Sequence, residues 1–218
     1  MKNKLAIIVP AIILAVGIGI AYKMIKEGRT LPIYAPAQIN PELVDESKQS
    51  VLKNHKIQDF ELINQDEEAV RLSDFDGYYY VADFFFTTCP TICPDMSGQL
   101  QRVQKAFADD EDFLIVSHTV QPEIDSAEIL KEYAELYQAN PKKWIFLTGN
   151  KKTIYDLARK SYFAAVTEGD GGPDDFIHTE NFVLIDKEKR IRGFYDGTSE
   201  KSVNQLITDI EILAQEYD

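Results

Sequence analysis

Cys89 and Cys93 are the only cysteines among the 218 residues, and they lie four positions apart in the run Phe-Phe-Phe-Thr-Thr-Cys-Pro-Thr-Ile-Cys-Pro. Residues i and i+4 share one face of a helical turn, so the two sulfurs are expected to lie close together. Two neighbouring sulfurs can close a disulfide, or both can bind one soft metal ion. The pair therefore predicts redox or metal chemistry.

The residues around the pair predict a strand that ends, and a helix that begins, at the cysteines. Residues 78–86 form an apolar run typical of a buried strand, and the stretch after Pro94 is typical of a helix. Backbone N–H groups and the positive dipole end at a helix start favour thiolate over thiol. Copper(I) binding and disulfide exchange both require a thiolate, so both chemistries remain open.

Alternating strands and helices must position this pair. Apolar, β-rich runs predict strands at residues 57–63, 69–72, 78–86, 113–120, 144–147, 182–185 and 191–195. Helical spacing of apolar residues predicts helices over 96–107, 129–137, 154–161 and 203–213. With a cysteine pair after the first long strand, this α/β order resembles the thioredoxin-like fold. We expect a mixed sheet with helices on both faces and an N-terminal hairpin extension.

A third metal ligand would have to be one of three histidines. His55 precedes the first predicted strand and is expected on the surface. His118 lies inside the 113–120 strand, which suggests packing or a hydrogen bond at the strand end. His178 follows a loop rich in Gly and Asp and directly precedes a core strand. In a thioredoxin-like sheet, that loop lies beside the helix that carries the cysteines, so His178 is the candidate ligand.

Two sets of carboxylates need an interpretation. Asp83 lies six residues before Cys89, where thioredoxins have a buried Asp. It could accept a proton from the thiols or tune their pKa. We favour a strand carboxylate that faces a polar neighbour or the solvent edge, because copper binding needs no base. Asp170, Asp174 and Asp175 are expected in a solvated loop.

Composition narrows the possible partners. The chain has 23 basic and 36 acidic side chains, a net charge of -13, which argues against nucleic acid as a partner. With 44% hydrophobic residues, its length suits one core with a small appendage. It contains no GxxxxGKS, HExxH or GxSxG pattern. We expect a single acidic globular domain.

The N-terminus predicts a membrane anchor. Lys2 and Lys4 precede residues 5–22, which carry no charge and are long enough, at about 1.5 Å per residue, to span the hydrocarbon layer as one helix. A cleavable signal peptide is the alternative, but no A-x-A site follows. The expected parts are an anchor at 1–26, a linker at 27–49 and the thioredoxin-like domain at 50–218. The linker's Leu-Pro-Ile-Tyr could instead pack on the domain. We expect a single-pass protein of the inner membrane with a periplasmic domain.

The cysteine run resembles the CxxxCP signature of the Sco (SenC-like) family. So do Leu-Thr-Gly at 147–149, Phe-Ile-His-Thr at 176–179 and Leu-Ile-Asp at 184–186. The resemblance runs from about residue 31 to the C-terminus, behind an N-terminal anchor as in that family. Family members often carry Asp-Pro after the strand that follows the CxxxC helix, where this chain has Gln121 and Pro122. Asp125 keeps the later acidic position.

The resemblance implies a copper metallochaperone that helps assemble the dinuclear copper site of cytochrome c oxidase. Cys89, Cys93 and His178 would be the copper ligands, and the copper-receiving oxidase subunit would be the partner. The alternative is a thiol–disulfide oxidoreductase in which Cys89 and Cys93 form the redox disulfide. Oxidoreductases of this fold usually show CxxC and do not need His178. Peroxidases place a Thr three residues before the reactive Cys, where this chain has Phe86.

Overall fold

The computed structural model describes residues 8, 10, 12–19, 29–44, 49–52, 55–166, 172 and 175–217. The chain divides into two compact units. One comprises Pro32–Ile207, and the other combines Met1–Leu31 with Thr208–Asp218. The cysteines and all three histidines lie in the first unit.

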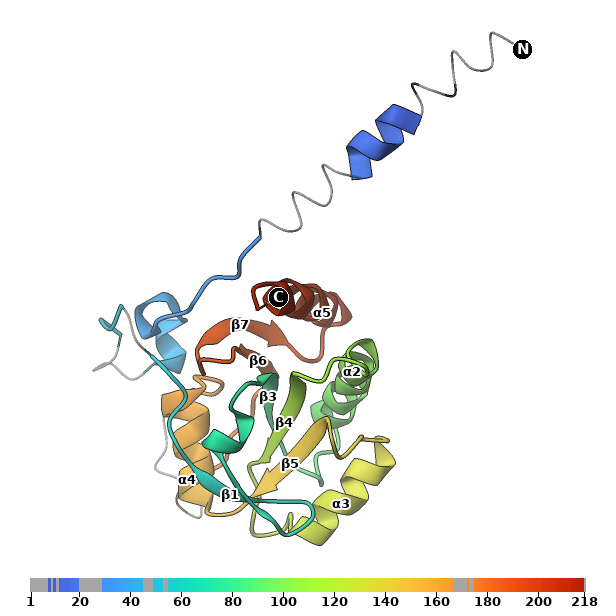
Figure 1. Cartoon of the computed structure of the whole chain (residues 1–218). Helices are drawn as coiled ribbons and strands as arrows, with labels where there is room; N and C mark the ends of the chain where they lie inside the picture. The colour runs from blue at the N-terminus through green and yellow to red at the C-terminus, as the bar shows by residue number, and fades with distance from the viewer. Residues whose placement is uncertain are drawn as a thin grey trace. The chain divides into compact units, whose positions relative to one another are not determined.

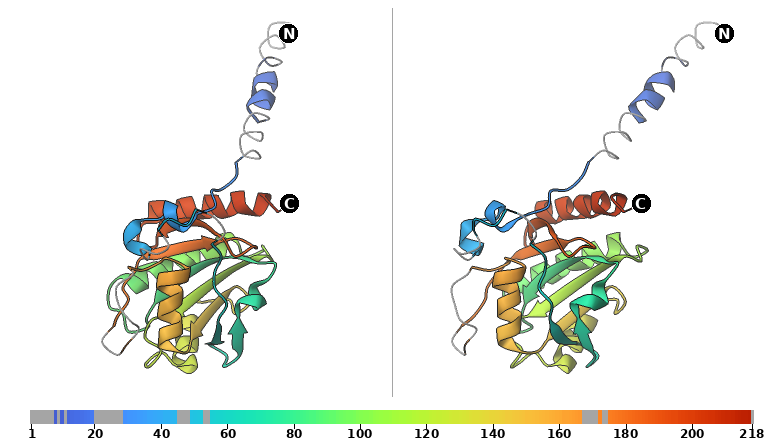
Figure 2. Two further views of the ribbon diagram at one scale, coloured as in Figure 1. Left: turned by 90° about the vertical axis from the view of Figure 1, so that its left-hand side faces the viewer. Right: turned by 60° about the vertical axis from the view of Figure 1, so that its left-hand side comes forward.

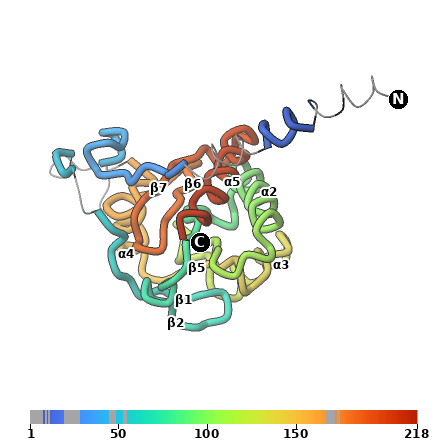
Figure 3. The backbone as a smooth tube through the Cα atoms, turned by 45° about the horizontal axis from the view of Figure 1, so that its top comes forward, coloured from blue at the N-terminus to red at the C-terminus, as the bar shows by residue number. Residues whose placement is uncertain are grey.

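A mixed sheet forms the centre of the Pro32–Ile207 unit. Its strands are β1 (Glu61–Asn64), β2 (Ala69–Arg71), β3 (Tyr79–Phe85), β4 (Phe113–Thr119), β5 (Trp144–Thr148), β6 (Asn181–Ile185) and β7 (Ile191–Asp196). In the described residues the order is β2-β1-β5-β4-β3-β6-β7, with β3, β4 and β5 parallel and the other pairs antiparallel. The β1–β2 hairpin and β7 lie at opposite ends of the sheet (Figure 3). The predicted mixed sheet and N-terminal hairpin are confirmed.

Helices cover both faces of the sheet, as predicted. They are α2 (Ile92–Ala106), α3 (Ala127–Leu136), α4 (Lys151–Asp156), its continuation as the π-helix η4 (Leu157–Ser161), and α5 (Glu200–Gln215). α2 and α3 lie on one face and α4 on the other (Figure 1). This follows from right-handed crossovers, because β3→β4→β5 advance in one direction and β5→β6 returns. Arg102 of α2 donates to Asn204 of α5 at 2.5 Å.

The central strands are buried on both faces, so all seven residues of β3 are buried and all but Asp83 are apolar or aromatic. Its side chains still alternate between two cores. Tyr80, Ala82 and Phe84 join the cluster that includes Ile154 of α4. Phe85, on the opposite face, packs against the Tyr133 ring of α3 with ring centroids 5.0 Å apart. β3 is therefore packed on both faces, and this fixes the position from which the segment leading to Cys89 starts.

Residues 32–44 pack on the sheet unit (Figure 2). The Tyr34 N–H donates to Ile191 O of β7 at 2.9 Å. Ile39 and Val44 are buried in the core cluster. The short 3-10 helices are η1 (Pro36–Gln38), η2 (Pro41–Leu43) and, after β2, η3 (Leu72–Phe75). Of the Leu-Pro-Ile-Tyr run, Tyr34 packs on the unit while Ile33 is 48% exposed, and the bounds of the linker stay a prediction.

The N-terminal stretch is helical at residues 8, 10 and 12–19. Within the described part of the chain, no helix has both the length and the apolar character that crossing a bilayer requires. Residues 5–7 and 20–22, which belong to the predicted span, lie outside the described residues. The membrane anchor therefore stays a prediction.

Candidate metal and redox centre

The two cysteines lie where β3 ends and α2 begins. β3 ends at Phe85 and α2 starts at Ile92, so Cys93 is in the first helical turn while Cys89 precedes the helix. The expectation that both lie on one helical face is therefore wrong. They are joined instead by a hydrogen bond from the Cys93 N–H to Cys89 Sγ, at 3.4 Å. First-turn N–H groups lack helical partners, and here the sulfur accepts one of them as an N-cap side chain would.

The two thiols differ in their ease of ionisation. Both are free and nearly buried, Cys89 at 8% and Cys93 at 3% exposure. Burial opposes ionisation of Cys89, but hydrogen bonds from the Cys93 thiol and the N–H groups of Thr91 and Cys93 outweigh it and lower the pKa of Cys89. Burial and the hydrogen bond with Cys89 raise the pKa of Cys93 to about 12. Cys89 is therefore the thiol that ionises first.

Asp125 holds the loop that leads into Cys89. Its buried carboxylate accepts the Thr87 N–H at 3.1 Å and the hydroxyls of Thr87 and Thr119. Its backbone carbonyl accepts the Thr148 hydroxyl at 2.8 Å. Asp125 thus ties the loop to the ends of β4 and β5. From the sequence, Asp125 was noted only as an acidic position after the second long strand, without a role.

His178 lies next to the segment that carries Cys89. Its exposed ring is 4.7 Å from that of Phe176 and 6.0 Å from that of Phe86, three residues before Cys89. The Phe86 and Phe176 rings are 5.0 Å apart. Among the described residues, no three His, Cys, Asp or Glu side chains are close enough to hold a metal ion. A three-ligand site therefore requires His178 to move toward the thiols, and the ligand assignment stays a prediction.

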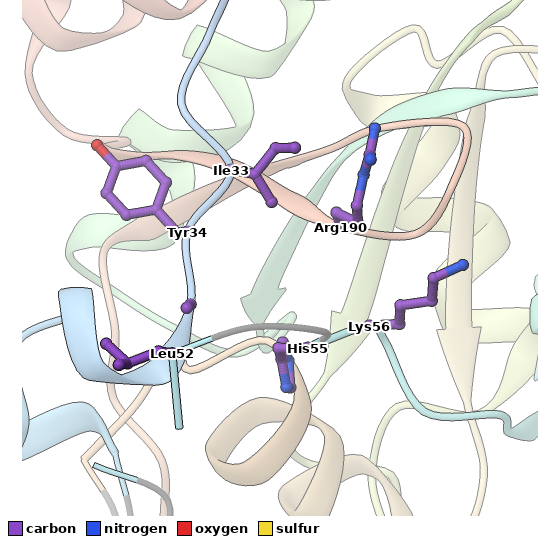
Figure 4. Close-up of a pocket in the computed structure, with 7 residues that line it drawn as sticks. Ile33, Tyr34, Leu52, His55, Lys56 and Arg190 are labelled. Atoms are coloured by element: carbon purple, nitrogen blue, oxygen red, sulfur yellow. The ribbon is translucent and has the colours of Figure 1, made fainter. Parts of the chain in front are cut away.

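His55 lies in a different part of the unit. Its Nε2 is 2.6 Å from Ser161 O, and because a carbonyl can only accept, this nitrogen carries the proton. It lines a pocket of about 460 Å³ (Figure 4). The pocket is lined by Ile33, Tyr34, Ala35, Leu52, His55, Lys56 and Arg190. Neither the cysteines nor His178 belong to it.

His118 is fully buried on the sheet face opposite α2. Its ring stacks on Phe84 with centroids 4.8 Å apart, and its Nδ1 is 3.4 Å from Asp83 O. Within the described part of the chain, its Nε2 has no hydrogen-bond partner. Burial lowers the pKa of His118 to about 4. The expected packing within the strand is confirmed, and this histidine does not join the cysteines.

Asp83 is buried on the face of β3 that α2 covers. Its carboxylate accepts the Ser117 hydroxyl at 2.5 Å, and Trp144 Nε1 donates to the same Ser117 oxygen at 2.8 Å. Burial raises the pKa of Asp83 to about 7. The favoured interpretation, a strand carboxylate beside a polar neighbour, agrees with this geometry. The alternative position at the solvent edge does not, because Asp83 is only 2% exposed.

Asp175 corrects the expectation of a solvated loop. Arg159 of η4 donates two hydrogen bonds to its carboxylate, at 2.5 and 2.7 Å. The Arg159 and Asp175 side chains are 5% and 9% exposed. The sequence prediction failed because the partner lies sixteen residues earlier, on a helix. Asp170 and Asp174 lie outside the described residues.

Comparison with known proteins places the chain in a family. The SCO1/SenC family model matches residues 48–215. The SCO1 protein homolog of Bacillus subtilis (strain 168) is 34% identical over 160 residues, which cover 72% of this chain and 82% of the homolog.

Solved structures are similar over the same region. BsSco, described as having a disulfide switch and as a member of the Sco family of cytochrome c oxidase assembly proteins, is 33% identical. Its TM-score is 0.64, with 76% of this chain and 96% of BsSco covered. Copper-bound ScoI of Arabidopsis thaliana is 25% identical with a TM-score of 0.56, and the match covers 74% of this chain and 98% of ScoI. The chain therefore belongs to the SCO1/SenC family and has its mixed α/β, thioredoxin-like fold.

Proposed function

We propose that this protein is a copper-binding assembly factor for cytochrome c oxidase, with Cys89, Cys93 and His178 as the copper ligands. One observation carries the proposal. Two thiols share a hydrogen-bonded turn, and the exposed histidine packs on Phe86 at the start of the same loop. The copper-bound plant relative and the described role of BsSco in oxidase assembly support it.

The donor set fits copper as cargo. Thiolates are preferred ligands of copper(I), and an added imidazole suits copper(II). Cys89 ionises readily, whereas Cys93, with a pKa of about 12, must lose its proton as the metal binds. Because the imidazole of His178 is exposed, a partner's thiols can displace it. The copper-receiving subunit of the oxidase is the proposed partner.

A second candidate function is thiol–disulfide exchange, which the unequal thiols favour. The Cys89 thiolate would attack a partner disulfide, and Cys93 would then attack Cys89 and release the reduced partner. The partner disulfide gains two electrons, and the Cys89–Cys93 pair loses them. The disulfide switch described for BsSco supports this candidate.

The proposed location is the inner membrane, with the domain on the periplasmic side. The uncharged stretch at residues 5–22, with Lys residues before and after it, supports an anchor at 1–26. It would hold the copper-binding unit near a membrane-bound oxidase. Protease accessibility of the domain in spheroplasts tests this placement, because a cytoplasmic domain would be protected.

Copper titration of the reduced full-length chain tests the function. Copper(II) should give an intense thiolate charge-transfer band, and copper(I) should bind the same thiols. His178→Ala should weaken copper(II) far more than copper(I), because two thiolates can hold the monovalent ion. His55→Ala is the matched control and should change neither copper(I) nor copper(II) binding. If the parent protein binds no copper, the exchange function replaces this one.

A further inference from the structure

The side chain of Arg159 links two residues that precede His178 in the chain, Val166 and Asp175. Its two terminal nitrogens donate to the Asp175 carboxylate, and its Nε donates to Val166 O at 3.0 Å. Residues 166 and 175 are thus held by one buried guanidinium. A bidentate Arg–carboxylate pair fixes orientation as well as distance. We call Arg159, Asp175 and Tyr155 the clamp, and residues 175–178 the His178 arm.

Tyr155 connects the clamp to the framework of the cysteines. Its hydroxyl lies 3.2 Å from Asp175 O and 3.0 Å from Val120 O. The Val120 N–H in turn donates to Phe85 O at 2.8 Å, at the end of β3. The Arg159 guanidinium lies over the Tyr155 ring, 5.3 Å from its centre. The start of the His178 arm is therefore fixed to the strand end from which the Cys89 loop leaves.

The arm beyond the clamp is short. Two residues lie between Asp175 and His178, so the three residue steps of an extended arm reach about 10 Å. Within it Phe176 is 37% exposed and contacts Phe86. Because His178 must move to reach the thiols, a fixed starting point limits the positions that its imidazole can take. Such a restraint lowers the entropy lost when the imidazole becomes a ligand.

We propose that Arg159 is a positioning residue for His178: the clamp holds the arm so that the imidazole can join the two thiolates around copper(II). This inference rests on the proposed function. A buried ion pair is weak evidence for a contribution to stability, so a role in placing the arm explains the clamp better. A purely structural role would affect both copper states equally, since it would disturb the whole unit.

The test uses the full-length double variant Arg159→Gln/Asp175→Asn, which leaves no unpaired buried charge. The matched control is Arg71→Gln, which breaks an exposed pair with Glu61 at the β1–β2 hairpin. The double variant should bind copper(II) about 10-fold more weakly or worse, as is common when a group that orients a metal ligand is lost. Nitrogen hyperfine coupling in its electron paramagnetic resonance spectrum should change. Copper(I) affinity, set by the thiols, should stay within about threefold.

Two results would overturn the inference. One is an equal loss of copper(I) and copper(II) affinity in the double variant. The other is an undiminished loss of copper(II) affinity when the double variant is placed in a His178→Ala background, because the clamp would then not act through His178. If the double variant causes no further loss of copper(II) affinity in the His178→Ala background, the inference is supported.

A copper-free measurement separates this inference from the proposed function. In the reduced protein, nuclear magnetic resonance should detect contacts between the His178 ring and Phe86, and these should disappear in the double variant but persist in Arg71→Gln. If the contacts between the His178 ring and Phe86 survive in the double variant, the clamp does not position His178. If they disappear while His178→Ala leaves copper(II) binding unaltered, the clamp is supported and the ligand assignment fails.

Discussion

The two thiols illustrate how hydrogen bonds separate residues of one type. Burial opposes ionisation of both thiols, but at Cys89 hydrogen bonds to the sulfur outweigh it and lower the pKa, whereas at Cys93 burial prevails and raises the pKa. We expect Cys89 to be alkylated faster than Cys93 near neutral pH, with a rate midpoint below that of an ordinary thiol. Mass spectrometry after brief iodoacetamide treatment at several pH values measures both sites. Cys93→Ala should raise the midpoint for Cys89, and equal rates at the two sites would contradict this.

Asp125 should matter more than an exposed carboxylate of the same type. In Asp125→Asn one acceptor oxygen becomes an NH₂ group that faces N–H or O–H donors of Thr87 or Thr119. Leaving such buried groups unpaired should lower the free energy of unfolding by about 1–3 kcal/mol. Urea denaturation measures the loss, with Asp109→Asn, at an exposed position, as the control. Equal midpoints for the two variants would refute the anchoring role.

Asp83 and His118 should give opposite pH dependences of stability. Burial raises the pKa of folded Asp83 from its ordinary 3.8 to about 7, so its stabilising effect is lost as pH rises from 3.8 to about 7. Folded His118 gains a proton only at about pH 4, against 6.5, so its stabilising effect is lost as pH falls from 6.5 to 4.

The variant Asp83→Asn removes the first effect and leaves the second. Its free energy of unfolding, relative to that of the parent, should therefore increase as pH rises from about 4 to 7, by up to about 1.4 kcal/mol per pH unit. His118→Phe should show the reverse trend. Urea denaturation across this range measures the difference, and parallel curves for parent and variant would show that Asp83 does not titrate in this range.

At the scale of elements, two glycines near the site should respond in opposite directions. Gly98 lies inside α2, where a Cβ would meet no atom of the described residues within 4 Å, so Gly98→Ala should stabilise the fold by about 0.5–1 kcal/mol. Gly149, between β5 and α4, has φ +152°, and its Cβ would lie 2.9 Å from Leu62 Cδ2. Gly149→Ala should destabilise by about 1–3 kcal/mol. The midpoints of urea denaturation measure both changes. If Gly98→Ala and Gly149→Ala shift the midpoint in the same direction, this interpretation of the two glycines is wrong.

Periodicity predicted most elements because burial imposes it. The expected strand at 113–120 and the observed β4 differ by one residue, and the predicted helices over 96–107 and 203–213 correspond to α2 and α5. The turn of π-helix at Leu157–Ser161 was predicted only as helix, because residue types do not distinguish i+4 from i+5 hydrogen bonding. This turn carries Arg159, so the clamp could not be predicted either.

At the scale of the whole molecule, some residues of the candidate site can be predicted from the sequence, whereas others are identified only in the folded structure. Cys89 and Cys93 were found from side-chain type and spacing, and His178 from its place in the expected topology and from the family resemblance. Asp125 and Arg159 were not, because their partners lie 38 and 16 residues away and become neighbours only in the folded chain. Most polar residues on a sequence are solvated, so burial had to be seen before these two acquired a role.

The domain boundary at residue 50 can be tested against the packing of residues 32–44. Ile39 and Val44 are buried, and Tyr34 bonds to Ile191. Each buried aliphatic side chain contributes about 1.5–3 kcal/mol. A protein starting at Pro32 should therefore be several kcal/mol more stable than one starting at Gln49. Thermal and urea unfolding of the two versions measure this, and identical transitions would leave residue 50 as the boundary.

The hydrogen bond from the Cys93 amide to the Cys89 sulfur has a consequence for observing this molecule. An amide that donates to sulfur senses the charge and occupancy of that sulfur directly. Its resonance position and its rate of deuterium uptake must therefore differ between thiol, thiolate, disulfide and metal-bound forms. A single labelled backbone nitrogen at the start of α2 is thus an internal reporter that follows the state of the centre in real time, without a dye or an added probe.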